Sequence, residues 1–184
     1  MKAIEILNEE HRVIKSFLAV QRKATELLDK GQIRPGFFIE AAEFIKGFVD
    51  DCHNKKEEDI LFATIREERD IAHQNELIDM LLLEHEKGGA YICELREAAQ
   101  KMEAGEVSAR DVVWSDAWAY IRLKMNHVLT EDYGVFPLAE TIIMFTRQEE
   151  MLNEDFERTM KGVLIAYEMK YLVLLHELAK EVGL

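Results

Sequence analysis

Two His-x-x-x-Glu pairs are the residues in this sequence best suited to metal chemistry: His53 with Glu57, and His127 with Glu131. Side chains four positions apart on a helix lie one above the other on the same face, so each imidazole and its carboxylate can reach one point in space. Imidazole nitrogens and carboxylate oxygens both bind first-row transition metals. Each pair therefore predicts one half of a metal site, carried on its own helix.

A single offset along the chain relates these pairs to two further histidines. Adding 74 to the three positions of a first half gives three residues of the same types in a second half, and the two histidines are 42 residues apart in both. The positions are His11, His53 and Glu57 in the first half and His85, His127 and Glu131 in the second. Such a repeat indicates a duplicated structural unit, and two helical hairpins close a four-helix bundle.

Four histidines and two glutamates aimed at one core need a partner, because an unpaired carboxylate in an apolar interior is costly. Metal cations remove this cost, since a carboxylate can bridge two metals and imidazole nitrogens can complete each coordination sphere. Structural zinc prefers four ligands in a closed tetrahedron, often with thiolates. The six-residue set is larger and richer in oxygen. It predicts a pair of iron ions, with positions left for water, an oxo or hydroxo bridge, or a small ligand.

The elements that would position these residues are helices. Apolar residues at spacings of three and four, few prolines and no strand-type alternation predict an all-α chain. We expect four helices, over about residues 3–29, 36–68, 75–103 and 109–133. Gly31 and Gly105 are placed to end the first and third helices, and Gly134 and Pro137 to interrupt the chain after the fourth. Short connections favour antiparallel neighbours, and so an up-down four-helix bundle.

The chain continues beyond this bundle. We expect one domain over residues 1–148, with a short helix near 138–148, and a C-terminal extension over 149–184. The extension is predicted to form one helix over about 150–182, with an apolar face around Tyr171. An apolar face needs a surface to cover it, so this helix should pack on the bundle or on a second chain, which would make a homodimer.

The pattern resembles the hemerythrin-like (HHE cation-binding) family of non-haem di-iron proteins. The segments that carry the resemblance are Asn8–His11, Cys52–Phe62 and His127–Pro137, within a match over about residues 3–140. The resemblance implies a bundle that holds two irons bridged by carboxylates. The implied assignment is one iron on His11 and His53, the other on His85 and His127, and bridges from Glu57 and Glu131.

One histidine of the oxygen-carrying hemerythrins is missing. Those proteins have a His-x-x-x-His pair on the third helix, whereas Leu81 and Gly89 occupy the matching positions on either side of His85. A missing ligand opens a coordination position or admits water. Redox or sensing chemistry is therefore at least as well supported as reversible oxygen carriage.

The identity of the second bridge has a competitor. The oxygen carriers bridge with an aspartate five residues after the fourth-helix histidine, where Asp132 stands in this chain. The internal repeat favours Glu131 instead, because its mate is Glu57. We therefore expect Glu131 to bridge.

Several residues near the predicted ligands allow two interpretations of their role. Glu58 and Asp132 are expected to be exposed or to support a ligand from behind. Glu10 and Glu84 could accept a ring N–H from a ligand histidine, although solvated charge on a helix face is the favoured interpretation. Cys52 is expected to be a buried, unreactive thiol.

Composition excludes several classes of function. The net charge of −13 argues against nucleic acid and against an anionic membrane surface as partners. No stretch of about 18 apolar residues occurs, and no signal peptide opens the chain. Two cysteines cannot build a disulfide framework and fit reduced thiols, so we expect a cytoplasmic protein.

These observations predict a non-haem di-iron protein that binds or senses a small ligand: dioxygen, peroxide or nitric oxide. Alternatives are iron handling, repair of iron centres, or a signalling or interaction module that the metal stabilises. A ferritin-like enzyme is disfavoured because such bundles use Glu-x-x-His pairs, and the sequence has none. We expect a metal-binding or sensing protein rather than a dedicated enzyme.

Overall fold

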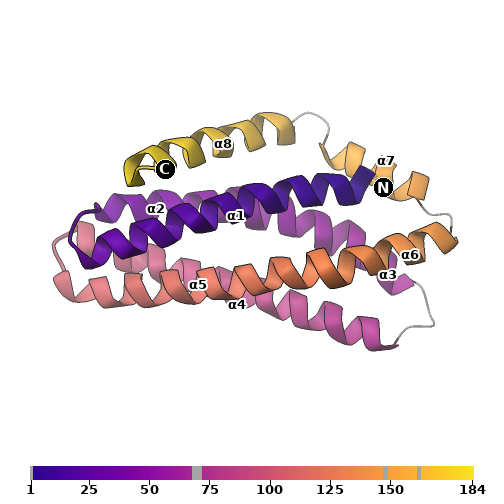
Figure 1. The fold of residues 1–184 in the computed structure, drawn as a ribbon, viewed down its shortest axis with the longest axis horizontal. Coiled ribbons are helices and arrows are strands. Elements are labelled where there is room, and N and C mark those ends of the chain that lie inside the picture. The colour runs from indigo at the N-terminus through magenta and orange to yellow at the C-terminus, as the bar shows by residue number, and fades with distance from the viewer. Residues whose placement is uncertain (1, 68–71, 147–148, 161–162) are drawn as a thin grey trace.

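The fold consists of four helical rods with two further helices at the C-terminal end (Figure 1). The computed structural model describes residues 2–67, 72–146, 149–160 and 163–184, and no strand occurs in these ranges. The first rod is α1 (Lys2–Asp29), and the third is α4 (Ala72–Glu103). The second comprises α2 (Pro35–Phe44), η1 (Ile45–Asn54), η2 (Glu57–Phe62) and α3 (Ala63–Glu67). The fourth comprises α5 (Arg110–Thr130), η4 (Glu131–Val135) and α6 (Phe136–Thr146), after a short 3₁₀ turn, η3 (Val107–Ala109). The prediction of an all-α helical bundle is confirmed.

Glycine ends the first and third rods as the sequence predicted. Gly31 and Gly105 have φ values of 66° and 98°, a region that side chains disfavour. Just beyond α1 the Gln32 N–H donates to Leu27 O at 3.0 Å, and beyond α4 the Glu106 N–H donates to Lys101 O at 2.9 Å. These reverse bonds satisfy the last carbonyls of each helix, so the chain turns sharply into the next rod.

Wide π-helical turns interrupt the second and fourth rods, where the sequence predicted regular α-helix. The stretches η1, η2 and η4 have this geometry. Glu57 is the first residue of η2, and Glu131 is the first residue of η4. The internal repeat therefore extends to a local change in the backbone, of a kind that is frequent at functional sites.

The fourth rod does not end near residue 133, and that prediction is wrong. It continues through Gly134 and Pro137 into α6, which ends at Thr146. In η4 the Phe136 N–H bonds to Glu131 O, five residues back. The wide turn ends at Val135, two residues before Pro137, so the ring lies in the first turn of α6, where a missing N–H is tolerated.

The C-terminal extension forms two helices rather than the single predicted one: α7 (Glu149–Met160) and α8 (Val163–Val182). Figure 1 shows α8 lying along the outside of the bundle, over α1 and α2. Tyr171 of α8 packs so closely on Gly47 that a Cβ at Gly47 would lie 1.9 Å from the tyrosine Cζ. Within the described ranges, no helix is both long and apolar enough to cross a membrane.

Two apolar clusters fill the interior and leave a polar layer between them. The larger cluster includes Ile14 of α1 and Leu95 of α4, with Tyr171 of α8. The smaller one surrounds Leu7 at the start of α1 and Leu81 at the start of α4. In the first three rods the predicted ligands fall between residues of one cluster and residues of the other; in the fourth, Glu131 does so, and His127 stands next to Val128 of the larger cluster. The ligands are thus held between two packed apolar layers.

Candidate metal centre

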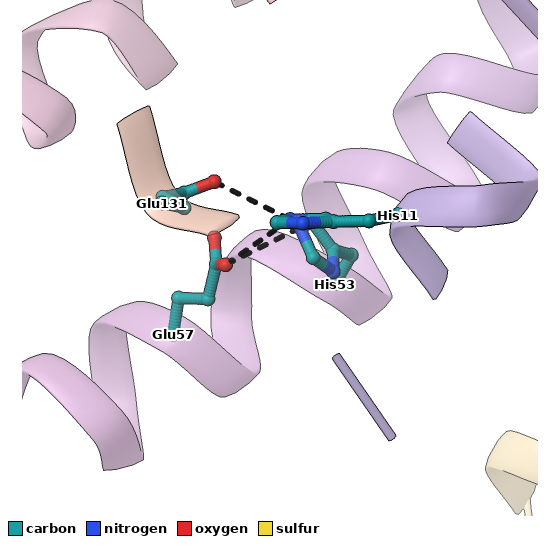
Figure 2. Close-up of side chains that lie close together, drawn as sticks. All are labelled: His11, His53, Glu57 and Glu131. Atoms are coloured by element: carbon teal, nitrogen blue, oxygen red, sulfur yellow. Dashed lines mark hydrogen bonds and ion pairs between the residues drawn. The ribbon is translucent and has the colours of Figure 1, made fainter. Parts of the chain in front are cut away.

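All six predicted ligands meet in this polar layer. Figure 2 shows His11, His53, Glu57 and Glu131 with their side chains directed toward one another. One ligand atom from each of these four lies within 4.8 Å of the others, and the same holds for a second set. The second set is Glu57, His85, His127 and Glu131. None of the six residues exceeds 9% exposure. The sets share both glutamates, so two histidine pairs face two common carboxylates.

The inner nitrogens of each histidine pair converge. Nε2 of His11 lies 3.1 Å from Nε2 of His53, and Nε2 of His85 lies 2.8 Å from Nε2 of His127. Each pair therefore aims two nitrogens at one small region. That arrangement suits a shared cation.

Glu57 offers one oxygen to each histidine pair. Its Oε1 lies 3.4 Å from His53 Nε2 and 3.7 Å from His11 Nε2. Its Oε2 lies 3.6 Å from His85 Nε2. A carboxylate divided in this way between two nitrogen pairs has the geometry of a bridging ligand.

Glu131 is divided in the same way, whereas Asp132 is not. Glu131 Oε1 lies 3.0 Å from His127 Nε2, and its Oε2 lies 3.3 Å from His11 Nε2. Asp132 instead lies behind His11, with Oδ1 2.6 Å from the outer ring nitrogen and Oδ2 2.5 Å from the Lys15 ammonium. This geometry favours Glu131 over Asp132 as the second bridge.

Each of the four histidines holds its outer nitrogen, Nδ1, against a carboxylate. The contacts are His11–Asp132 at 2.6 Å, His53–Glu10 at 2.9 Å, His85–Glu58 at 2.6 Å and His127–Glu84 at 2.9 Å. Such partners fix the tautomer and the ring orientation of a metal-ligating histidine. The favoured interpretation of Glu10 and Glu84 as solvated charges is wrong. The four acids themselves obey the offset of 74, from Glu10 to Glu84 and from Glu58 to Asp132.

A phenylalanine ring covers one face of two of the imidazoles. Phe136 stacks on His11 with ring centroids 5.0 Å apart, and Phe62 stacks on His85 at 6.3 Å. Positions 62 and 136 are again 74 apart, and each ring belongs to the opposite half from the histidine it covers. The two halves of the chain therefore interlock at the site.

The charge states of the site follow from burial and from close carboxylates. Burial lowers the pKa of His85 to about 2, and burial with the nearby His11 lowers the pKa of His53 well below its usual value. Burial also lowers the pKa of His11, but contacts with Asp132, Glu131 and Glu57 outweigh it and raise that pKa to about 10. Burial and Lys124 also lower the pKa of His127, but Glu131 and Glu84 outweigh them and raise it. Without a metal, the carboxylates of the site thus favour the protonated form of His11 and, in the same direction, of His127.

The two glutamates titrate as a pair. Burial and then the charge of Glu131 raise the pKa of Glu57 to about 7. Burial would also raise the pKa of Glu131, but His127 and His11 outweigh it and lower that pKa. All four carboxylate oxygens are buried, and none has a hydrogen-bond partner among the described residues. Buried oxygens of this kind are stabilised by cations, so the donor set fits a pair of first-row metal ions.

The first half of the site is closed by residues that the sequence did not indicate. Lys56 is fully buried, contacts Glu10 Oε1 and reaches Glu168 Oε1 of α8 at 3.1 Å. Cys52 Sγ donates to the same Glu168 oxygen at 3.2 Å. The acids and the thiol of this cluster could hold a metal, but the Lys56 ammonium already lies between Glu10 and Glu168. Burial raises the pKa of Cys52 to about 12, as expected of an unreactive thiol.

A second buried lysine lies on the other side of the site. Lys124 Nζ donates to Asn54 Oδ1 at 3.0 Å. Neither Lys56 nor Lys124 has a lysine at the position 74 residues away, so the repeat could not reveal them. One signal was present: Lys124 precedes His127 by three residues, which places both on the same helix face.

An all-helical bundle with histidine pairs around two shared carboxylates is the architecture of a metal-binding helical protein. The sequence profile of the hemerythrin HHE cation binding domain matches residues 2–139. The chain belongs to this family, and its fold carries the family's metal-binding function. The resemblance predicted from the sequence is confirmed.

Curated relatives share this chain's sequence over most of its length. Uncharacterised proteins of Mycobacterium bovis and of two Mycobacterium tuberculosis strains are each 28% identical over 156 residues. The match covers 84% of this chain but only 60% of each relative, so the chain spans about three fifths of their length. Comparison with solved structures finds no match.

Proposed function

We propose that this protein holds two iron ions in the bundle and uses them to bind or sense a small ligand: dioxygen, peroxide or nitric oxide. One iron would be held by His11 and His53, and the other by His85 and His127. Glu57 and Glu131 would bridge them. The irons would supply redox chemistry and open positions for the ligand. The chain's own residues orient the imidazoles and exclude bulk water.

The division of each glutamate between two histidine pairs is the observation that carries the proposal. A site for one ion would need only one pair, and the two inner nitrogens of the second pair would then be buried without a metal to bind. Here the oxygens of Glu57 face His53 on one side and His85 on the other, at 3.4 and 3.6 Å. Carboxylates and imidazoles in this combination suit iron better than zinc.

The count of ligands supports small-ligand chemistry. Two imidazoles and two shared carboxylate oxygens give each ion four protein donors, and iron commonly accepts more. Leu81 and Gly89 supply no further donor beside His85. Among the described residues, the two sets contain six ligands in all, and no further histidine or carboxylate joins them. The positions that remain would be available to small molecules.

Iron analysis of protein purified from iron-replete cells tests the proposal. We expect about two irons per chain and ferric charge-transfer absorption that changes on exposure to air or azide. Glu131→Gln should lose at least one iron, whereas Asp132→Asn should retain both at saturating iron, because only Glu131 faces both histidine pairs. Less than one iron per chain in the unmodified protein would refute the proposal. Two irons with a spectrum indifferent to every small ligand would instead indicate a structural role for the metal.

A further inference from the structure

Lys124 is a buried ammonium without a counter-ion at contact distance. Its residue is 5% exposed, and its Nζ donates to Asn54 Oδ1. No carboxylate pairs with it among the residues that the structure describes. An ammonium has three N–H donors, so two remain without an acceptor there. Burying a charge in this way is costly unless an anion accompanies it.

The other buried lysine shows what a completed arrangement looks like. Lys56 lies between the carboxylates of Glu10 and Glu168, on the side of the site that holds His53. For Lys124, the nearest equivalent of these carboxylates is reached only through Asn54. Asp50 accepts a long hydrogen bond of 3.4 Å from Asn54, which in turn accepts from Lys124. The first half of the site is therefore closed by internal ion pairs, and the second half is not.

A small cavity separates Lys124 from the second histidine pair. Its volume is about 10 Å³, and its wall includes Lys124, Tyr120, His85 and His127. A space of this size accommodates about one water-sized atom. Tyr120 is 2% exposed, and its hydroxyl has no hydrogen-bond partner among the described residues. Among the described residues, an ammonium with two unpaired N–H groups and a phenol hydroxyl without a partner thus line one cavity beside one half of the metal centre.

From this juxtaposition we propose that Lys124 and Tyr120 form the recognition site for a small inorganic anion that binds at the His85–His127 half of the centre. The inference rests on the proposed di-iron function and specifies the charge and the position of its ligand. The ligand class is a small anion that would place one atom in the cavity, such as hydroxide, hydroperoxide, fluoride or azide. The ammonium would donate a charge-assisted hydrogen bond to it, and the phenol would donate a second, weaker bond.

Two cations in the centre strengthen the case. They would add positive charge beside an ammonium that has no carboxylate at contact distance among the described residues, so an anion in the cavity would relieve both. Glu84 and Asp50 also line the cavity. Glu84 is committed to His127 Nδ1, and Asp50 is held by Asn54, so neither supplies a direct partner for the ammonium. The first half of the site has no counterpart of Lys124, because position 50 carries an acid instead.

Anion titrations of the iron-loaded protein test the assignment. Azide binding is followed by its charge-transfer band, and fluoride by competition with azide. Lys124→Met should weaken azide binding by about tenfold or more, and Tyr120→Phe by about threefold, as expected for loss of a charged and of a neutral hydrogen bond. Lys46→Met removes the same charge from an exposed ion pair with Asp51 and should leave the affinity within about twofold. The affinity of the reduced protein for nitric oxide, which is neutral, should change little in all three variants.

Iron content is measured on the same samples, so the two proposals fail separately. Wild-type protein with less than one iron per chain refutes the di-iron function. Fully loaded Lys124→Met with wild-type azide affinity refutes the anion site alone, as would an equal loss in Lys46→Met. If Lys124→Met does not load iron, Tyr120→Phe decides: it removes one oxygen atom from the cavity wall, and unchanged anion affinity in that variant overturns the proposal.

Discussion

The raised pKa of His11 predicts how the stability of the metal-free protein depends on pH. Metal-free protein should become less stable as pH rises from 7 to 9, and metal-loaded protein should not. The pKa of His11 is raised to about 10: burial opposes protonation, but contacts with Asp132, Glu131 and Glu57 outweigh it. A raised pKa means that the folded chain keeps a proton which the unfolded chain releases. The stability that this proton contributes is complete below the unfolded pKa of 6.5 and is lost as pH rises through about 10.

The size of the effect follows from the width of this window. Between pH 7 and 9 the unfolded imidazole is largely neutral, while the folded one remains protonated, so each pH unit costs about 1.4 kcal/mol of stability. The loss over the two units is then about 2–3 kcal/mol. The raised pKa of Glu57, about 7, lies at the lower edge of the window, and the lowered pKa of His85, about 2, lies well outside it. Neither should change the sign between pH 7 and 9.

Urea unfolding of chelator-treated and metal-loaded protein at three pH values measures the slope. A metal on the inner nitrogen of His11 displaces this proton, so the loaded protein should show little loss over the same range. Asp132→Asn is the matched variant, because the Asp132 contact is the strongest of those that raise the pKa of His11. It should flatten the slope of the metal-free protein. Metal-free stability that is constant or rises between pH 7 and 9 would refute the reasoning, as would an unchanged slope in Asp132→Asn.

Two further predictions concern α8. Glu168→Gln should lower iron affinity about three- to tenfold in chelator competition, less than the ten- to hundredfold typical of a residue that touches a ligand histidine. Glu177→Gln, which removes the same charge from an exposed pair on the same helix, should have no such effect; equal losses would argue against the contact of Glu168 with the site. Gly47→Ala should lower the free energy of unfolding by about 1–3 kcal/mol, since the added methyl group would overlap the Tyr171 ring. Gly89→Ala, with nothing within 4 Å of its added methyl, should raise the free energy of unfolding by up to about 1 kcal/mol. A higher free energy of unfolding in both variants would contradict the packing of Tyr171 on Gly47.

The ligand positions could be predicted from the sequence because the constraint on them is local and is repeated. Glu57 follows His53 by four positions, about one helical turn, and the second copy of the pattern repeats this spacing at His127 and Glu131. The ends of α1 and α4 could be predicted for a similar reason, since a left-handed residue after a helix calls for glycine. Each of these signals depends on near neighbours in the chain.

What could not be predicted depends on distant contacts or on backbone geometry that leaves no period in the sequence. Glu168 lies 112 residues from Lys56, and no repeat connects them. The wide turn at Glu131 changes the hydrogen-bond pattern without changing which residues are apolar, so Gly134 and Pro137 predict an interruption where the helical rod in fact continues. The outer acids Glu10 and Glu84 had the right spacing, but their burial depends on how the rods pack.

The two halves of the centre should differ in chemistry because some buried residues depart from the repeat. Inner ligands, outer acids and stacked rings all obey the offset of 74, so they give the two halves closely similar sets of residues. The lysines do not obey it. In the first half Lys56 is clamped between Glu10 and Glu168, and α8 closes that side. In the second half Lys124 lines a cavity, and two of its three N–H groups have no acceptor among the described residues. A symmetric duplicated site thus becomes directional through residues outside the repeat, and the exogenous ligand should enter at the half where the positive charge is not yet balanced.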